Sequence, residues 1–290
     1  QLRRGPEPLE PLEARLVLGG RAAPAAEPSL LDLSDINLDA RNNFGEQLEA
    51  SRNYSYNPMT DTYYGFCVGW TIDPANYRRS LWEQVGMPDG PVTWEDLITY
   101  GGRIREEQGV QLGIGLAQEI DSNMAHRSLM YSYGASLQDA DGNVILDEGE
   151  NFERVLETVD YMQRLYQAAM TPEVFAWNAA SNNQALIAGR ASYILNSISA
   201  YRSAQEDVPD IANDVFMGPA LQGPDGTALV NAHVIYNYVV PRHTANADLA
   251  KQFILDLATN YDQAMYHSKL YNSPSFFSTP VPGEDRDYDM

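Results

Sequence analysis

The sequence predicts an α/β fold, in which strands and helices alternate along the chain. Short apolar runs of strand length recur between longer segments whose apolar residues have the spacing of amphipathic helices. Gly, Pro, Asn and Ser bound these runs, as they commonly do at the ends of strands and helices. With 290 residues, of which 44% are hydrophobic, the chain is long enough for two globular units.

The first 29 residues differ from the rest of the chain. They contain five prolines, which exclude long helices and central strands. We therefore expect residues 1–29 to be irregular. An element edge is expected to begin at Leu30, and the polar residues 42–57 have the composition of a surface segment.

The first clear helix is expected over residues 73–86. Asp73-Pro74 supplies an N-cap followed by a proline in the first turn, and Gly86 supplies a left-handed stop. The apolar face of this helix would be formed by Tyr77, Leu81, Trp82 and Val85.

Two more helices are indicated further along the chain. One begins at Thr93, with Asp96 as its capping-box partner, and ends at Gly109. The other covers about residues 150–169 and ends before Thr171-Pro172. The spacing predicts that its buried face consists of Phe152, Val155, Leu156, Val159, Met162 and Tyr166.

Strands are expected where apolar runs are short and bounded by turn residues. Four segments meet this description: residues 111–116, 191–195, 215–217 and 234–240. Their alternation with the helices is what indicates the α/β class.

The charge balance excludes several classes of partner. The chain has 40 acidic and 19 basic side chains, which gives a formal net charge of −21. Nucleic acids and anionic membranes are both recognised by clustered Lys and Arg. We therefore expect no nucleic-acid partner. The sequence also has no run of about 18 apolar residues, the length that a membrane span requires.

Motifs of several common catalytic sites are missing from the sequence. No Gly-x-Ser-x-Gly elbow occurs, and the four histidines are too scattered for a His-Glu-x-x-His zinc site. Gly113-Ile-Gly115 has Gln118 where a dinucleotide fingerprint has its third glycine. Cys67, the only cysteine, lies in an apolar stretch typical of a buried structural thiol. The many carboxylates leave open a glycosidase pair.

Three segments resemble, in the same order, motifs of extracellular solute-binding proteins of ABC importers, of the sugar-binding type (family 1). The first covers residues 69–88 and continues with Pro91-Val-Thr-Trp-Glu-Asp-Leu97. The second is residues 183–196, which include Gly189-Arg-Ala-Ser192. The third begins at Gly218-Pro-Ala-Leu221 and continues with the helix pattern of residues 247–254. Asn272-Ser-Pro274 is similar to the closing segment of the family.

The resemblance runs from Tyr63 to Phe277 and has departures. Thr71-Ile72 stands where the family has Asn-Lys, and Ser199 stands where a tryptophan is often found. Substrates of other members therefore indicate little about the ligand of this chain.

The resemblance implies a two-lobed, periplasmic-binding-protein-like (type II) fold, with a ligand in the cleft between the lobes and closure about a hinge. Residues 1–66 would form the N-terminal part of the first lobe, and residues 67–232 the second lobe. Residues 233–270 would return to the first lobe, and residues 271–290 would form a closing segment and tail. We expect the first lobe to be incomplete at its N-terminus.

The resemblance also indicates where ligand contacts would lie. A sugar presents polar edges and apolar faces, so its site needs aromatic plates and short, fixed hydrogen-bonding groups. Trp70, on the crossover strand, is the first candidate, with core packing as the alternative. N-capping competes for Asn178, and a structural role competes for His233. The other candidates are Tyr63, Tyr64, Trp177, Asn183, Asn196, Ser197, Ser199, Tyr201 and Asn272. Trp82 and Trp94 are expected in the core.

The resemblance implies a binding protein without enzymatic activity, cofactor or metal. It would capture a small solute, with a sugar or oligosaccharide as the expected class, and deliver it to an ABC permease in the membrane. We expect a monomer outside the cytoplasm, either free or held at the cell surface by a lipid anchor. The alternative is a carbohydrate-active enzyme, a glycosidase or lyase, with paired carboxylates beside Trp70.

Overall fold

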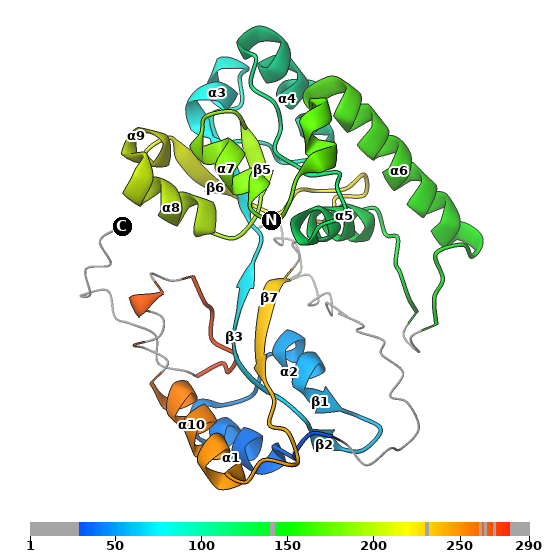
Figure 1. Ribbon diagram of the computed structural model, residues 1–290. Helices are drawn as coiled ribbons and strands as arrows, with labels where there is room; N and C mark the ends of the chain where they lie inside the picture. The colour runs from blue at the N-terminus through cyan, green and yellow to red at the C-terminus, as the bar shows by residue number, and fades with distance from the viewer. Residues whose placement is uncertain are drawn as a thin grey trace, which may run out of the picture.

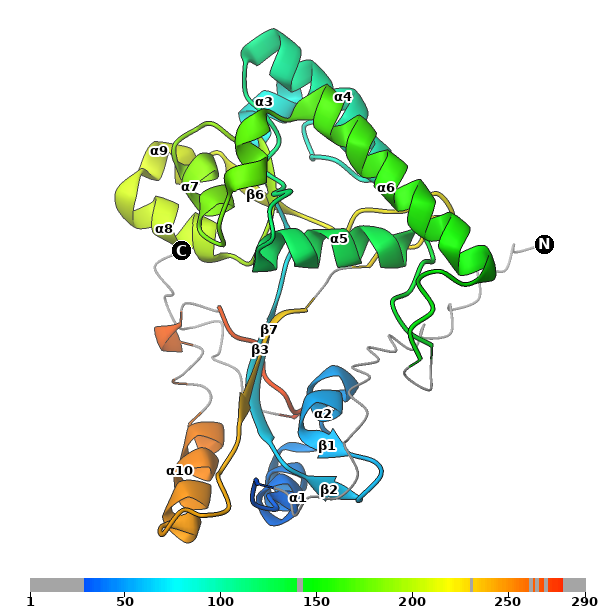
Figure 2. The same cartoon turned by 45° about the vertical axis from the view of Figure 1, so that its right-hand side comes forward.

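A computed structural model describes residues 29–139, 143–229, 232–260, 263, 266–268 and 271–278 of the chain. Two parts of the molecule are joined by a long ribbon of two strands (Figures 1 and 2). The upper part consists of α3–α9, η1 and β4–β6, and the lower part consists of α1, α2, β1, β2 and α10. The predicted mixture of strands and helices is confirmed.

The connecting ribbon consists of β3 (Phe66–Ile72) and β7 (Ala232–Tyr238), which pair antiparallel. Phe66 lies opposite Tyr238 at the lower end, and Thr71 lies opposite Val234 near the upper end. Shifts in the register between Cys67 and Gly69 and between Thr71 and Ile72 interrupt the regular pairing. The chain thus crosses from the lower part to the upper part in one strand and returns in the neighbouring one.

The upper part has a small antiparallel sheet in the order β5-β4-β6. Its core includes Trp82, which packs edge-on against Tyr193, and Trp94, which packs edge-on against Tyr161. The expectation that both tryptophans are buried is confirmed. The strands are β4 (Ala75–Arg78), β5 (Tyr193–Leu195) and β6 (Val215–Gly218). The helices are α3 (Arg79–Gln84), α4 (Trp94–Gln108), α5 (Ile120–Ser132), α6 (Gly149–Ala169), η1 (Pro172–Ala176), α7 (Ser181–Ile187), α8 (Ser199–Asp207) and α9 (Pro209–Ala212).

The lower part has its own apolar core, which joins segments from both ends of the chain. Leu33 and Ile36 pack there with Phe66, Ile254 and Phe276. The Phe66 and Phe276 rings lie 5.9 Å apart between their centroids. The elements of this part are α1 (Ser34–Phe44), α2 (Glu49–Ser55), β1 (Tyr56–Asn57), β2 (Thr62–Tyr63) and α10 (Ala247–Thr259). The expected surface segment at residues 42–57 therefore includes a helix, in which Ser51 and Ser55 are buried.

The predicted helix at 73–86 is wrong in its first half. Residues 75–78 form β4, the central strand of the upper sheet, and the helix begins only at Arg79. Ala75 and Tyr77 pair with both neighbouring strands and are buried, so tertiary pairing overrides the local helix-start signal. Gly86 does adopt a left-handed conformation, with φ of 93°, just after the helix.

The helix at 94–108 is confirmed in detail. The Thr93 hydroxyl accepts a hydrogen bond from the backbone N–H of Asp96, and the Asp96 carboxylate accepts one from the backbone N–H of Thr93. Gly109 ends the helix with φ of 72°. This capping box satisfies N–H groups that the helix itself leaves without partners.

The extent of α6 is confirmed, and its predicted buried face is right for Met162 and Tyr166, which pack against the upper core, but wrong for three other residues. Phe152, Leu156 and Val159 are 40%, 45% and 60% exposed. The buried face is instead Thr158, Tyr161, Leu165 and Ala169, which turns toward α4. On this face the Tyr161 hydroxyl donates to the backbone carbonyl of Trp94 in the core.

Three of the four predicted strands correspond to β5, β6 and β7. Residues 111–116 instead form an isolated bridge, in which Gln111 pairs with Ala191. Leu112 and Ile114 are nevertheless buried. Cys67 is buried as expected, and burial raises the pKa of its thiol. Within the residues described, no helix combines the length and the apolar character needed to cross a membrane.

Candidate functional site

Polar side chains from four segments of the upper part meet at the end of β5. Asn196 and Ser197 follow this strand directly, Asn182 and Asn183 lie in the first turn of α7, and Ser199 begins α8. Asp121, in the first turn of α5, completes the group. We call Asp121, Asn182, Asn183, Asn196, Ser197 and Ser199 the asparagine cluster.

Asn196 is the centre of the asparagine cluster. Its Nδ2 lies 2.9 Å from Asp121 Oδ2, 2.8 Å from Asn183 Oδ1 and 3.2 Å from Asn182 Oδ1. Its backbone carbonyl accepts a hydrogen bond of 2.8 Å from Nδ2 of Asn76 on β4. Asn196 is 2% exposed, so these partners fix the amide and replace the water that it loses.

Asn183 and Ser199 form the more accessible edge of the asparagine cluster. Asn183 Nδ2 donates to Ser199 Oγ over 3.1 Å, and Ser197 Oγ donates to the same oxygen over 3.0 Å. Both residues are half-buried, whereas Ser197 is fully buried. The buried members therefore support Asn183 and Ser199, the two partly accessible residues of the cluster.

A second group lies on the connecting ribbon. The indole Nε1 of Trp70 donates to the carbonyl of Pro274 over 2.7 Å, and the backbones of Trp70 and Ser273 exchange two hydrogen bonds. Tyr236 on β7 lies beside Tyr271; burial, with the Tyr271 hydroxyl adding to it, raises the pKa of Tyr236 to about 12. We call Trp70, Tyr236, Tyr271, Asn272 and Ser273 the hinge group.

Asn272 and Trp70 are the two members of the hinge group with unused contact potential. Oδ1 of Asn272 is buried and has no hydrogen-bond partner among the described residues. Trp70 is half-buried, so part of its ring remains accessible. The hinge group thus combines a partly accessible aromatic ring with a buried polar atom that lacks a partner among the described residues.

Other predicted site residues lie near the asparagine cluster in sequence but have additional contacts. Trp177 is half-buried and packs against the upper core. Asn178 is exposed, and its Oδ1 accepts from the backbone N–H of Ala180 in a local turn rather than capping α7. Tyr201 is half-buried on α8, and its hydroxyl accepts a hydrogen bond from Gln205.

The remaining predicted residues lie elsewhere. Tyr63 belongs to β2 of the lower part, where its ring lies 4.9 Å from that of Tyr56 and lines a separate cavity. Tyr64 follows it and is half-buried. His233 belongs to β7, but its side chain lies outside what the structure describes.

Sequence reasoning missed Asp121 and Tyr236. The only sequence signal for Asp121 is an acidic residue in the first turn of a helix, which is common and nonspecific. Glu119, two residues earlier, caps the same helix by accepting from the backbone N–H groups of Asp121 and Ser122. Tyr236 could have been suspected only if the pairing of β7 with β3 had been known.

Comparison with known proteins places the chain in a family. Residues 22–264 match the family model described as bacterial extracellular solute-binding protein. A curated binding protein of Brucella abortus (strain 2308) is 22% identical over 165 residues, which make up 56% of this chain and 39% of the relative.

Solved structures with the same fold include two with bound sugars. The maltose-bound MalE3 of T. maritima has a TM-score of 0.72 at 19% identity, over 86% of this chain and 63% of that one. A sugar transporter structure from Arthrobacter chlorophenolicus A6 with bound laminaribiose has a TM-score of 0.68 at 18% identity, over 87% and 62%.

The chain thus spans 39% of the length of the curated relative and somewhat less than two thirds of these solved proteins. The neighbours confirm the predicted periplasmic-binding-protein-like fold, and the family match confirms the resemblance noted in the sequence motifs. The chain belongs to the family of bacterial extracellular solute-binding proteins.

Proposed function

We propose that the protein captures a sugar or oligosaccharide between its upper and lower parts and delivers it to an ABC importer. The observation that carries this proposal is the asparagine cluster, in which Asn196 is held by three side-chain oxygens while Asn183 and Ser199 stay accessible. Short, preorganised amides and hydroxyls bind a polyhydroxylated ligand with little loss of side-chain entropy.

The hinge group would supply the apolar contact. We propose that Trp70, Tyr236 and Tyr271 lie against a sugar face and that Asn272 Oδ1 accepts from a sugar hydroxyl. Tyr201 and Trp177 would extend the site at its upper rim, and His233 and Tyr64 would contribute from the ribbon and the lower part. Asn178 would contribute only at the rim, since it is exposed.

We propose that residues 67–232 form one lobe and that residues 233–270 return to the other. The β3–β7 ribbon would then act as the hinge, because it is the element that connects the two cores. Closure would bring Tyr54 on α2 closer to Arg127 and Tyr131 on α5; burial raises the pKa of the Tyr54 hydroxyl, and the nearby charge of Arg127 partly offsets this. The protein would work outside the cytoplasm, and attachment by a lipid anchor is part of this proposal.

Known ligands of neighbours support the sugar class, since the solved structures include complexes with maltose and laminaribiose. A carbohydrate-active enzyme is less well supported. The nearby carboxylates are already engaged: Asp121 accepts from Asn196, and Glu119 caps α5.

Calorimetric titration of the purified protein with maltose, laminaribiose and chitobiose tests the proposal. We expect saturable binding by at least one sugar and no product in the mixture. Asn183→Ala and Ser199→Ala should each weaken this binding about tenfold, since each removes about one hydrogen bond at a desolvated site. Ser203→Ala, on the exposed side of the same helix α8, is the matched control.

Two results would contradict the proposal. Release of a shorter sugar during the titration would indicate an enzyme. Equal binding by the Asn183, Ser199 and Ser203 variants would show that the ligand lies away from the asparagine cluster.

A further inference from the structure

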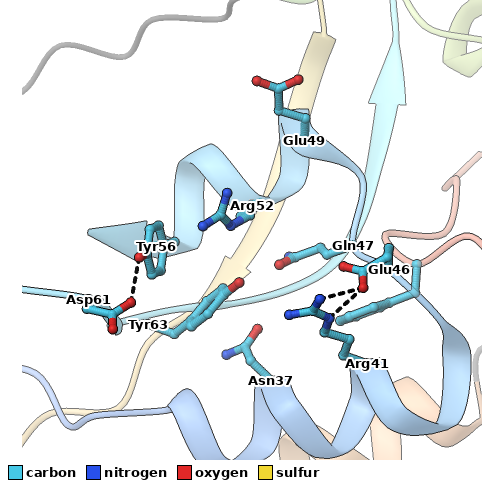
Figure 3. Close-up of a pocket in the computed structure, with 10 residues that line it drawn as sticks. Asn37, Arg41, Glu46, Gln47, Glu49, Arg52, Tyr56, Asp61 and Tyr63 are labelled. Carbon is cyan, nitrogen blue, oxygen red and sulfur yellow. Dashed lines mark hydrogen bonds and ion pairs between the residues drawn. The ribbon is translucent and has the colours of Figure 1, made fainter. Parts of the chain in front are cut away.

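The lower part contains a cavity of about 520 Å³, which is lined by no residue of the asparagine cluster or of the hinge group. It lies between α1 and α2, and the β1–β2 hairpin closes one side (Figure 3). Its volume is in the range of small-molecule sites. The lining residues that concern a ligand are Asn37, Arg41, Gln47, Arg52, Tyr56 and Tyr63.

Two guanidinium groups point into this cavity. Figure 3 shows Arg52 reaching in from α2 and Arg41 from α1. Arg41 forms an ion pair with Glu46, whose carboxylate accepts a hydrogen bond from Arg41 Nε over 2.8 Å. Arg52 lies 4.3 Å from the Tyr56 ring centre and beside the Tyr63 hydroxyl, and it forms no ion pair with any carboxylate in the described ranges. The charge of Arg52 therefore has no carboxylate partner and is available to an anion, while the Tyr56 and Tyr63 hydroxyls lie close to its donors.

Three carboxylates, those of Glu46, Glu49 and Asp61, also line this cavity, and none of them forms an ion pair with Arg52 within the described residues. The Asp61 carboxylate accepts from the Tyr56 hydroxyl over 2.7 Å. Glu49 points away from the cavity centre in Figure 3. Of the two guanidinium groups, Arg52 is thus the one without a carboxylate partner, and it shares the cavity with the amides of Asn37 and Gln47.

A neutral acceptor faces the same space. Asn37 is 3% exposed, and its Nδ2 donates to the carbonyls of Leu33 and Gly65 over 2.9 and 3.0 Å. These two carbonyls fix the amide so that Oδ1 points to the cavity side in Figure 3; this oxygen is buried and has no hydrogen-bond partner among the described residues. Buried amide oxygens are nearly always hydrogen-bonded, so a hydrogen-bond donor on a bound molecule would satisfy Asn37 Oδ1.

The lining is therefore complementary to a small molecule that carries both an anionic group and a hydroxyl. We propose that this cavity binds a sugar acid, with its carboxylate on Arg52, a hydroxyl donating to Asn37 Oδ1, and its ring carbons against Tyr63. A neutral sugar would leave Arg52 without its anion. Inorganic phosphate would reach Arg52 but would leave Asn37 Oδ1 poorly satisfied. This second site does not depend on the sugar site between the two parts.

Titration with D-galacturonate, D-galactose and inorganic phosphate tests this proposal at low ionic strength. We expect galacturonate to bind at least tenfold more tightly than phosphate to the wild-type protein. Arg52→Gln should weaken galacturonate binding at least tenfold, and Arg41→Gln should weaken it less, because Arg41 is already paired. Arg190→Gln, which removes an arginine that is 55% exposed in the upper part, is the control.

Circular dichroism should show that all three variants fold, since all three arginines are exposed. Asn183→Ala shows whether galacturonate binds in this cavity or at the asparagine cluster. If this variant loses galacturonate while Arg52→Gln retains it, the acid binds at the asparagine cluster and the proposal is overturned. Absence of galacturonate binding, or phosphate binding of equal strength, also overturns it.

Discussion

Nδ2 of Asn196 lies 2.9 Å from Oδ2 of Asp121, although the two residues are 75 positions apart in the chain. Both side chains are almost fully buried, at 2% and 7% exposure. A hydrogen bond to a buried carboxylate is among the stronger polar contacts of a protein. This bond joins the start of α5 to the end of β5 and sets the position of the other amides around it.

Asp121→Ala should lower the free energy of unfolding by about 1.5–3 kcal/mol, because it removes a charged hydrogen-bond acceptor from Asn196. Urea unfolding followed by circular dichroism measures the change. Asp248→Ala, which removes an exposed first-turn aspartate of α10, should cost at most about 1 kcal/mol. Equal losses in the two variants would show that the contact with Asn196 contributes nothing.

The capping box of α4 gives a second prediction. Thr93→Ala should lower the free energy of unfolding by about 1 kcal/mol, since the Thr93 hydroxyl accepts from the backbone of Asp96. Thr99→Ala changes the same residue type on an exposed turn of the same helix and should leave stability equal or slightly higher. Thermal and urea unfolding of both variants make the comparison; a larger loss in Thr99→Ala would contradict the assignment of the cap.

The orientation of α6 gives a third prediction, on the stability of variants on its two faces. Leu165 is fully buried, so Leu165→Ala should cost about 2–5 kcal/mol of unfolding free energy. Leu156 is 45% exposed on the opposite side, and Leu156→Ala should change stability by no more than about 0.5 kcal/mol. The reverse order in urea unfolding would restore the face that the sequence pattern predicts.

Tyr236 gives a prediction on pH. Its pKa is raised to about 12, above the ordinary value of 10.0, so the folded state keeps a proton that the unfolded state loses. Stability from this group is complete below about pH 10 and falls as the pH rises from 10 to 12. Tyr236→Phe should therefore show a shallower loss of stability over this range than the wild type, measured by thermal unfolding at several pH values.

Tyr166→Phe, a change on α6 away from the ribbon, controls for the removal of any tyrosine hydroxyl. If the Tyr236 and Tyr166 variants follow the wild-type curve equally, the environment of Tyr236 is not what the structure indicates.

Local sequence signals predicted an element correctly where residues close to it in sequence determine its structure. Thr93 and Asp96 predict the start of α4 because both partners of the capping box lie within four residues. Asp73-Pro74 gives an equally strong local signal and fails, because Asn76 and Tyr77 pair with strands more than 100 residues away. A local sequence pattern contains no information about pairing between strands that are so far apart in the chain.

The same distinction explains the site. The motifs indicate Asn183, Asn196 and Ser199, which the structure brings together by hydrogen bonds over short stretches of the same region. Asp121 joins them only through the packing of α5, so nothing near it in the sequence marks it. On α6, apolar spacing predicts the helix but not its rotation, which depends on the tertiary packing of Tyr161, Leu165 and Ala169 in the upper core.

The contact between Phe66 and Phe276 has a consequence for the order in which the chain folds during synthesis. The upper sheet uses residues 75–218 only, so its strands can pair as soon as that stretch has left the ribosome. The lower core needs Phe276, which is made last among its members. The upper part can therefore be complete while Leu33, Ile36 and Phe66 still lack their partner, and these apolar residues are the ones that a chaperone would have to shield in the meantime.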